Sequence, residues 1–212
     1  MSVSSVAIAR KPSETDRRDH ILAAAERAFA EHGFHATTMQ HVAKAAAMSA
    51  GNLYRTFPSK EAIVEGLCAR DQQERIDSFV SIAEGGSVFA AFEAGLHEHF
   101  ASRTRDKARL LVEIWAEAAR NPAIAAMSLG VDADIIGKIA HVIQLAKDRG
   151  EAAPAIDPRA IARLMFTYFG GLLKRQAIEP DFDPDDEIAR ALGLLKALCS
   201  GAVSTNEREA SQ

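Results

Sequence analysis

The side chains with the clearest chemistry lie in one short segment, residues 49–60. Asn52 can exchange hydrogen bonds with the edge of a base, and Arg55 can donate to a base edge or bind the phosphate backbone instead. Beside them, Gly51 is also expected to face outward, and Ala50 offers a thymine methyl group an apolar contact but no hydrogen bond. The candidates for phosphate contacts are Thr38, Ser49, Tyr54 and Lys60. These residue types predict a surface that contacts double-stranded DNA.

A short helix is needed to present these side chains on one face. Ser49 is a suitable N-cap for such a helix, and Leu53 and Phe57 are spaced four residues apart, so that both point inward. Burial of this pair turns residues 50–52, 54 and 55 outward or along the edge of the core. For Tyr54 the alternative is an aromatic ring at the core edge whose hydroxyl stays in water.

Two further helices are predicted upstream of this segment. Apolar residues at helical spacing end at Gly33, where a left-handed cap would pack Phe34 back onto Phe29. Thr37 followed by Gln40 matches a capping box, which predicts that a second helix of about three turns or less starts there. The sequence therefore predicts a three-helix unit in which the last two helices are joined by a tight turn.

The run from Arg17 to about Ala62 resembles the N-terminal domain of the TetR family of transcriptional regulators. The resemblance rests on the Gly-aromatic pair after the first helix, the Thr-Thr pair, the small residues of the second helix, the Ser-x-Gly-Asn-Leu-Tyr segment and the Phe-Pro-Ser-Lys-Glu exit. It implies a cytoplasmic, all-helical homodimer whose C-terminal domain binds a small-molecule effector and thereby controls affinity for a DNA operator. The function expected from it is a repressor released from a palindromic operator, with a transcriptional activator, or a helical protein-binding adaptor without DNA binding, as alternatives.

Two residues depart from the pattern of the family. Ala47 stands where the family usually has glycine, so either the turn differs or Ala47 adopts a positive φ, which costs about 1 kcal/mol or more. Ala50 stands where relatives often carry Lys or another polar residue, so base reading is expected to depend on Asn52 and Arg55.

Charge is distributed unevenly along the 212 residues, whose net charge is −4. The first sixty residues carry eight Lys or Arg against five Asp or Glu, whereas the remainder carries seventeen against twenty-four. This asymmetry favours a DNA-facing N-terminal part and an acidic body, the alternative being a chance partition of few charges. The two distant cysteines, and the lack of a signal-like start or an apolar stretch of about 18 residues, favour a reducing, cytoplasmic setting with no membrane span.

Beyond residue 59 the apolar residues recur at helical spacing, and no alternating strand pattern occurs. The fold class expected is all-α with about nine helices. Three helix starts are marked by an Asx-Pro pair, at residues 121–122, 157–158 and 183–184. The expected divisions are a flexible arm (1–14), a helix-turn-helix DNA-binding domain (15–60), a helical ligand-binding and dimerisation domain (61–200) and a disordered tail (201–212).

The last two predicted helices are candidates for a dimer interface. The first of them is apolar on more than one face, and the second has leucines at heptad-like spacing. Gly170 and Gly171 suggest that something approaches the backbone closely there. The residues expected at the interface are Met165, Phe169, Leu172, Leu173, Leu192 and Leu195, the alternative being that both helices belong to one core.

The effector site is expected between helices of the body. Its candidate lining residues are Phe89, Phe92, Phe100, Glu113, Trp115, Phe166 and Tyr168, although such residues are more often ordinary packing. The sequence contains no His-Glu-x-x-His, phosphate-binding glycine loop or Gly-x-Ser-x-Gly, and His97 and His99 face different sides of a helix. We therefore expect no enzyme activity, no cofactor and no metal site.

Overall fold

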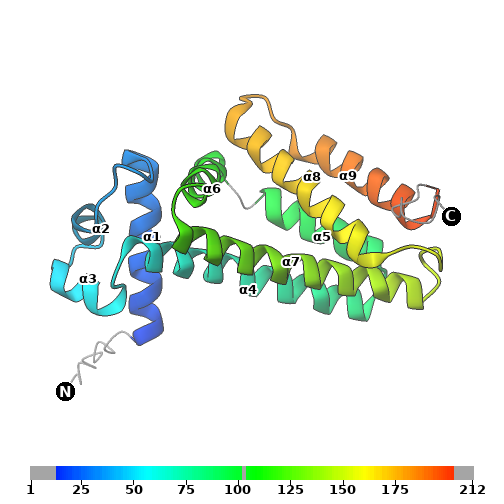
Figure 1. Ribbon diagram of the computed structural model, residues 1–212, viewed down its shortest axis with the longest axis horizontal. Coiled ribbons are helices and arrows are strands. Elements are labelled where there is room, and N and C mark those ends of the chain that lie inside the picture. Colours follow the sequence, from blue (N-terminus) through cyan, green and yellow to red (C-terminus); the bar gives the residue numbers. More distant parts are fainter. Residues whose placement is uncertain (1–12, 102–103, 203–212) are drawn as a thin grey trace, which may run out of the picture. The chain divides into compact units, whose positions relative to one another are not determined.

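The computed structural model describes residues 13–101 and 104–202, without the side chains of residues 71–77 and 101. Within these ranges the chain forms nine α-helices and no strand, which confirms the all-α class (Figure 1). The helices are α1 (Glu14–His32), α2 (Met39–Ala45), α3 (Ala50–Thr56), α4 (Lys60–Gly85), α5 (Val88–Ala101), α6 (Arg105–Ala118), α7 (Pro122–Asp148), α8 (Pro158–Ile178) and α9 (Pro184–Cys199).

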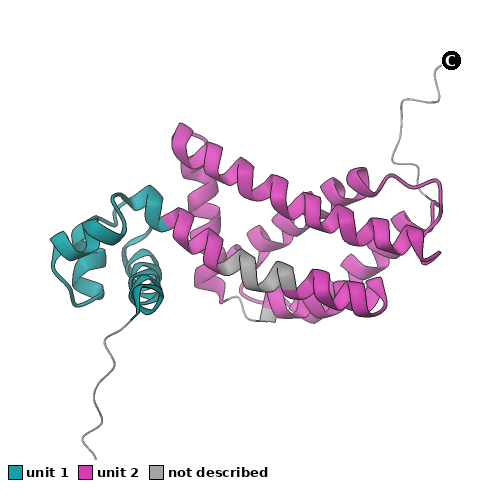
Figure 2. Ribbon diagram, turned by 90° about the horizontal axis from the view of Figure 1, so that it is seen from below, with its two compact units in different colours: residues 1–63 teal, residues 64–212 magenta. Residues whose placement is uncertain are grey.

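The chain divides into two compact units, Met1–Ile63 and Val64–Gln212 (Figure 2). Helix α4 runs through the boundary, because its first turn belongs to the N-terminal unit and the rest to the C-terminal unit. Helix α1 begins at Glu14, with Ser13 as its N-cap, so it starts one residue inside the expected arm. The rest of that arm and nearly all of the expected tail lie outside the described residues.

The N-cap of α2 lies one residue later in the chain than expected. Thr38 is the N-cap and His41 completes the capping box, in place of Thr37 and Gln40. The reason is that Thr37 is buried, and its hydroxyl lies 3.1 Å from the carbonyl of Ala28 and 2.7 Å from that of Gly33, where it donates to the end of α1. The second threonine of the pair is therefore the one left to cap α2.

The turn between α2 and α3 contains a left-handed alanine. Ala47 has a φ of 51°. The N–H of Met48 donates to the carbonyl of Ala43 and that of Ala47 to the carbonyl of Lys44, which is the hydrogen-bond pattern of a Schellman motif. The same pattern closes α7, where Gly150 has a φ of 74°. Of the two alternatives for Ala47, the strained conformation is therefore the one adopted.

The helices of the C-terminal unit surround one apolar core. Within it α7 lies against α6 and α8, and α9 against α5 and α8. Asn121, Asp157 and Asp183 cap α7, α8 and α9, each with a side-chain oxygen that accepts from two backbone N–H groups, as the Asx-Pro pairs predict. Cys199 lies in this core, and burial raises the pKa of its thiol to about 11, which makes it unreactive at neutral pH.

Two charged residues after α7 close the turn between α4 and α5. The Arg149 guanidinium donates to the carbonyls of Ala83, Glu84 and Gly86 at 2.7 Å, at the C-terminal end of α4. The Glu151 carboxylate accepts from the N–H of Val88 at 3.1 Å, at the N-terminal end of α5. Each charge complements the dipole of the helix end that it meets, so the pair fixes this turn.

None of the described helices combines the length and the apolar character that a membrane crossing requires.

The strained turn gives a test of stability. Replacing Ala47 by Gly relieves the clash of Cβ at positive φ, and we expect the free energy of unfolding to rise by about 0.5–1 kcal/mol after the greater entropy of glycine in the unfolded chain is subtracted. The control is Ala46→Gly, since Ala46 is buried with a φ of −85° and should lose stability. Urea unfolding measures both, and a less stable Ala47→Gly variant would contradict the strain.

Candidate nucleic-acid interface

Helix α3 is held by two buried side chains and presents the opposite face to solvent. Leu53 is 0% and Phe57 1% exposed, whereas Tyr54 is 50% exposed. Arg55 and Gly51 are also exposed, and Ala50 and Asn52 are half-buried. The predicted outward face of α3 therefore exists, and all five of its residues lie on one seven-residue helix.

Two of the three candidate phosphate-binding hydroxyls, those of Ser49 and Thr38, are helix caps. The Ser49 hydroxyl accepts from the N–H of Asn52, and the Thr38 hydroxyl accepts from the N–H of His41, each at 3.3 Å. A hydroxyl that accepts through one lone pair still carries its own O–H. Capping is thus compatible with donation to a phosphate, and both side chains are exposed.

The two candidate base-reading residues contact each other. Nη2 of Arg55 donates to Oδ1 of Asn52, one helical turn away on the same face of α3. Because a guanidinium only donates, this bond also fixes which end of the Asn52 amide faces Arg55. The two side chains therefore form one polar unit on the outward face.

Lys60 has a different position from the one expected of a phosphate ligand. Its Nζ lies 3.0 Å from the carbonyl of Phe34 and 3.3 Å from those of His35 and Thr37. The same ammonium sits 4.5 Å from the centroid of the Phe34 ring. Its three N–H groups are thus matched by carbonyls of the loop between α1 and α2, so Lys60 closes this loop from the first residue of α4, and its contact with a phosphate stays a prediction.

Two residues of α1 that the sequence reasoning missed hold the end of α2. Nε2 of His20 donates to the carbonyl of Ala46 at 2.9 Å, and Nη2 of Arg27 donates to that of Ala45 at 3.3 Å. These carbonyls have no partner within a seven-residue helix. The signal that could have found His20 and Arg27 is their spacing of seven residues, which puts two donors on one face of α1.

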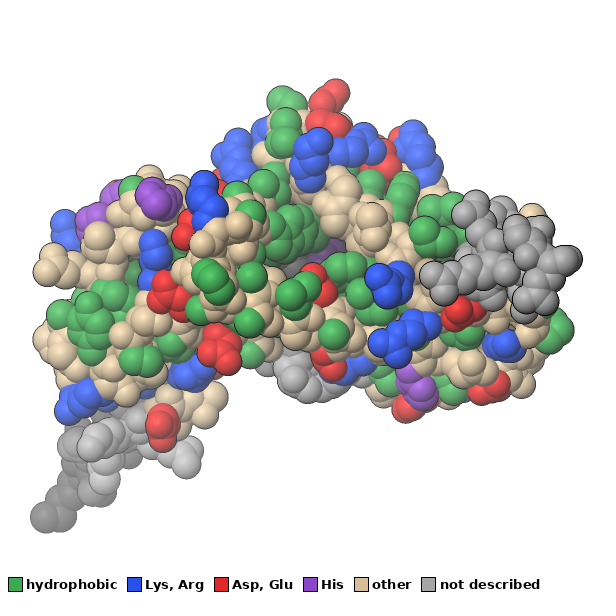
Figure 3. Space-filling model, in the orientation of Figure 1, with side chains coloured by type: hydrophobic (Ala, Val, Ile, Leu, Met, Phe, Trp, Pro, Cys, Tyr) green, Lys and Arg blue, Asp and Glu red, His purple; other side chains and the backbone are tan. Residues whose placement is uncertain are grey.

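Histidines gather at one end of the N-terminal unit (Figure 3). The ring centroids of His32 and His41 lie 4.6 Å apart. Within the described part of the chain, however, no three His, Cys, Asp or Glu residues are grouped so that they could hold a metal ion. This end of the unit therefore offers an aromatic contact between α1 and α2.

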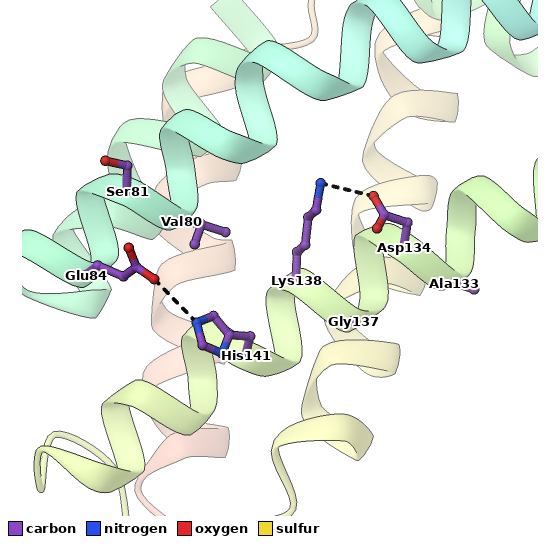
Figure 4. Close-up of a pocket in the computed structure, with 8 residues that line it drawn as sticks. All are labelled: Val80, Ser81, Glu84, Ala133, Asp134, Gly137, Lys138 and His141. Carbon is purple, nitrogen blue, oxygen red and sulfur yellow. Dashed lines mark ion pairs between the residues drawn. The ribbon is translucent and has the colours of Figure 1, made fainter.

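The C-terminal unit contains an open groove of about 450 Å³ between α4 and α7 (Figure 4). Glu84 lies 3.7 Å from His141 across it, and Asp134 lies 3.2 Å from Lys138 along α7. The residues that line it are Val80, Ser81, Glu84, Ala133, Asp134, Gly137, Lys138 and His141. Charges of both signs on a small-residue floor suit a polar ligand that both donates and accepts hydrogen bonds.

None of the seven residues expected at the effector site lines this groove. Phe92 and Phe100 are buried in the core, and Phe89 and Tyr168 pack against it. Trp115 is 37% exposed. The other two, Glu113 and Phe166, are exposed and half-buried respectively, on α6 and α8. Core packing therefore explains most of this set, and the prediction that they form one pocket receives no support.

The residues expected at the dimer interface are also occupied within one chain. Met165, Leu172, Leu173, Leu192 and Leu195 belong to the core of the C-terminal unit, and Phe169 packs against it. Packing within one chain accounts for the burial of these side chains, so the prediction that they form an interface receives no support here and stays a prediction. The exposed apolar positions on these helices are instead Leu164 and Ile178 on α8 and Leu194 on α9.

Exposed glycines leave open backbone on both α8 and α9. A Cβ added at Gly171 or Gly193 would meet nothing within 4 Å, and both positions are exposed. Leu164, Gly171 and Ile178 are spaced seven residues apart, which puts them on one face of α8. The face left uncovered by the chain's own core is thus formed by large apolar residues and bare backbone.

Comparison with known proteins gives the family. A family model described as bacterial regulatory proteins, tetR family, matches residues 21–67, and one described as the C-terminal domain of BetI-type transcriptional repressors matches residues 90–200. The HTH-type transcriptional regulator UidR of Escherichia coli K12 is 34% identical over 196 residues, which cover 89% of this chain and 94% of UidR.

Solved structures give the same result. GusR of Salmonella enterica has a TM-score of 0.74 at 30% identity, over 86% of this chain and 95% of GusR. The fatty acid degradation regulator FadR of Bacillus halodurans shares the fold, with a TM-score of 0.77 at 19% identity over 89% of this chain and 97% of FadR. UidR is described as a transcriptional regulator and FadR as a regulator of fatty acid degradation. Together with the outward face of α3, the matches show that the chain belongs to the TetR family of bacterial transcriptional regulators.

Proposed function

We propose that this regulator is a repressor, which binds a palindromic operator as a homodimer and leaves it when a small molecule binds the C-terminal unit. The observation that carries the proposal is the burial of Leu53 and Phe57, which leaves Asn52, Tyr54 and Arg55 on an accessible helix face. Such a face fits the major groove, where base edges differ in their donors and acceptors. The protein acts in the cytoplasm, where the DNA lies.

The homodimer is proposed to form through the uncovered face of α8 and α9. Leu164 is 50% and Leu194 38% exposed, and the bare backbone at Gly171 and Gly193 allows two helices to approach closely. A two-fold axis at this face gives the dimer two copies of α3. These must lie about 34–36 Å apart, or a multiple of that distance, to read two half-sites.

Helix α4 is proposed to couple effector binding to DNA affinity. It lines the α4–α7 groove with Val80, Ser81 and Glu84, and its first residue, Lys60, closes a loop of the N-terminal unit. We consider two states of the protein that differ in the position of α4, of which one binds DNA more tightly. An effector that binds the other state better lowers DNA affinity, by an amount set by the difference between its affinities for the two states. Such couplings are typically worth about 1–3 kcal/mol.

The function is tested by DNA binding of the full chain. We expect selective retardation of the DNA upstream of its own coding region against an unrelated duplex, with affinity falling as salt rises. Arg55→Ala should lose selectivity, because Arg55 lies on the exposed face of α3, whereas Arg159→Ala in α8 removes the same charge and should not. A gel shift measures both, and binding without any sequence preference would count against the proposal.

The role of Lys60 is tested by Lys60→Met, which keeps the aliphatic chain and removes the ammonium. Loss of the hydrogen bonds to the carbonyls of Phe34, His35 and Thr37 should lower the free energy of unfolding by about 1–2 kcal/mol. The slope of log affinity against log salt should stay unchanged, whereas the loss of one phosphate contact in each protomer would reduce it by about 0.9 per contact, or about 1.8 for the dimer. Lys44→Met, at an exposed position of α2, is the control for stability. A reduced slope with unchanged stability would restore the phosphate assignment.

The dimer face is tested by Leu164→Glu and Leu194→Glu. Burying a carboxylate at an apolar interface is costly, so we expect both variants to sediment as monomers where the unsubstituted chain is a dimer. Leu129→Glu on α7, at a residue that is 68% exposed, is the matched control and should remain dimeric. Sedimentation equilibrium distinguishes these cases, and dissociation by Leu129→Glu alone would move the interface to α7.

A further inference from the structure

The Asn52–Arg55 unit of α3 offers mainly hydrogen-bond donors to its surroundings. Oδ1 of Asn52 already accepts from Nη2 of Arg55. What remains is the rest of the guanidinium N–H groups and both N–H groups of the Asn52 amide, against a single free lone pair on Oδ1. That oxygen is further polarised by the cation beside it. The unit is therefore rich in donors and poor in acceptors.

The bond to Asn52 still leaves Arg55 able to donate two parallel hydrogen bonds to one base. A guanidinium has two forks of parallel N–H groups, one formed by Nε and Nη2 and the other by Nη1 and Nη2. Nη2 contributes one N–H group to each fork, so donating one of them to Asn52 leaves the other fork complete. Because Arg55 is otherwise an exposed and flexible side chain, the bond to Asn52 also limits where that fork points.

The base edges of DNA differ in how well they fit such a unit. In the major groove guanine presents two acceptors, N7 and O6, whereas adenine presents one acceptor and one donor. The usual bidentate contact of asparagine with adenine needs the amide oxygen as an acceptor. In this chain that oxygen is shared with Arg55, so guanine fits the donors of the unit better than adenine does.

We propose that Arg55 reads a guanine in each half-site and that Asn52 is a positioning residue, which holds the guanidinium fork in place instead of reading an adenine itself. The inference rests on the proposed DNA binding of α3 and adds the base that this helix selects. It also gives the two residues unequal roles: Arg55 contacts the base, and Asn52 acts through Arg55.

The test selects sequences from a randomised duplex library with the full chain and three variants. The unsubstituted chain should enrich one guanine at a fixed position of each half-site. Arg55→Lys keeps the charge without the fork, and we expect the preference for guanine there to fall roughly five- to a hundredfold. Asn52→Ala should weaken the preference at the same position and leave all other positions unchanged.

Asn52→Asp separates positioning from reading. A carboxylate still accepts from Arg55 but has no N–H group, so the guanine preference should be retained, while overall affinity falls because the new charge faces phosphates. Asn52 and Arg55 are not fully buried, and thermal unfolding followed by circular dichroism checks that each variant is folded.

Two outcomes would overturn the inference without touching the proposed function. One is an enriched motif that has no guanine in the half-site. The other is a motif in which Asn52→Ala abolishes an adenine preference while the guanine preference stays intact. Failure of the unsubstituted chain to enrich any sequence would instead overturn the proposed function, and the inference with it.

Discussion

The N-terminal unit depends on backbone groups that its short helices cannot satisfy by themselves. Helices α2 and α3 have seven residues each, so most of their N–H and carbonyl groups lack a partner within the helix. Donors from outside complete them: His20 and Arg27 bind the end of α2, and Thr37 and Lys60 bind the carbonyls of the loop before it. The end of α2, which leads into the turn before α3, is therefore held by side chains of α1.

Signals confined to a few neighbouring residues predicted this structure well. Ser49 caps α3, and Leu53 and Phe57 are buried, because a cap and an apolar spacing of four are set within one helical turn. The capping box of α2 was placed one residue too early because Thr37 and Thr38 are equivalent in sequence. Only the carbonyls at the end of α1, brought close by the fold, distinguish them. The contacts of the Lys60 ammonium with carbonyls were missed for the same reason, since these partners lie in a loop more than twenty residues away.

In the C-terminal unit the sequence showed which positions are apolar but not what covers them. A heptad-like spacing fits a helix packed on its own core as well as one packed on a second chain, and Leu192 and Leu195 belong to the core. The groove between α4 and α7 was missed because the sequence reasoning looked for a pocket lined by aromatic residues. Its lining includes the small residues Ala133 and Gly137 and no aromatic ring except that of His141. Which apolar residues are covered, and where a groove stays open, depends on the whole fold and cannot be read from spacing alone.

The closure of the α4–α5 turn has a mechanical consequence. Arg149 fastens the last turn of α4 to the segment after α7, and Glu151 fastens the start of α5 to the same segment, so this end of α4 acts as a fixed pivot. Helix α4 has 26 residues and is therefore about 39 Å long. A tilt of about 5° around the pivot would swing its opposite end by roughly 3 Å, about two residues of helical rise. For a straight helix of this length, a small change of angle at one end would become a displacement comparable to a base-pair step at the other.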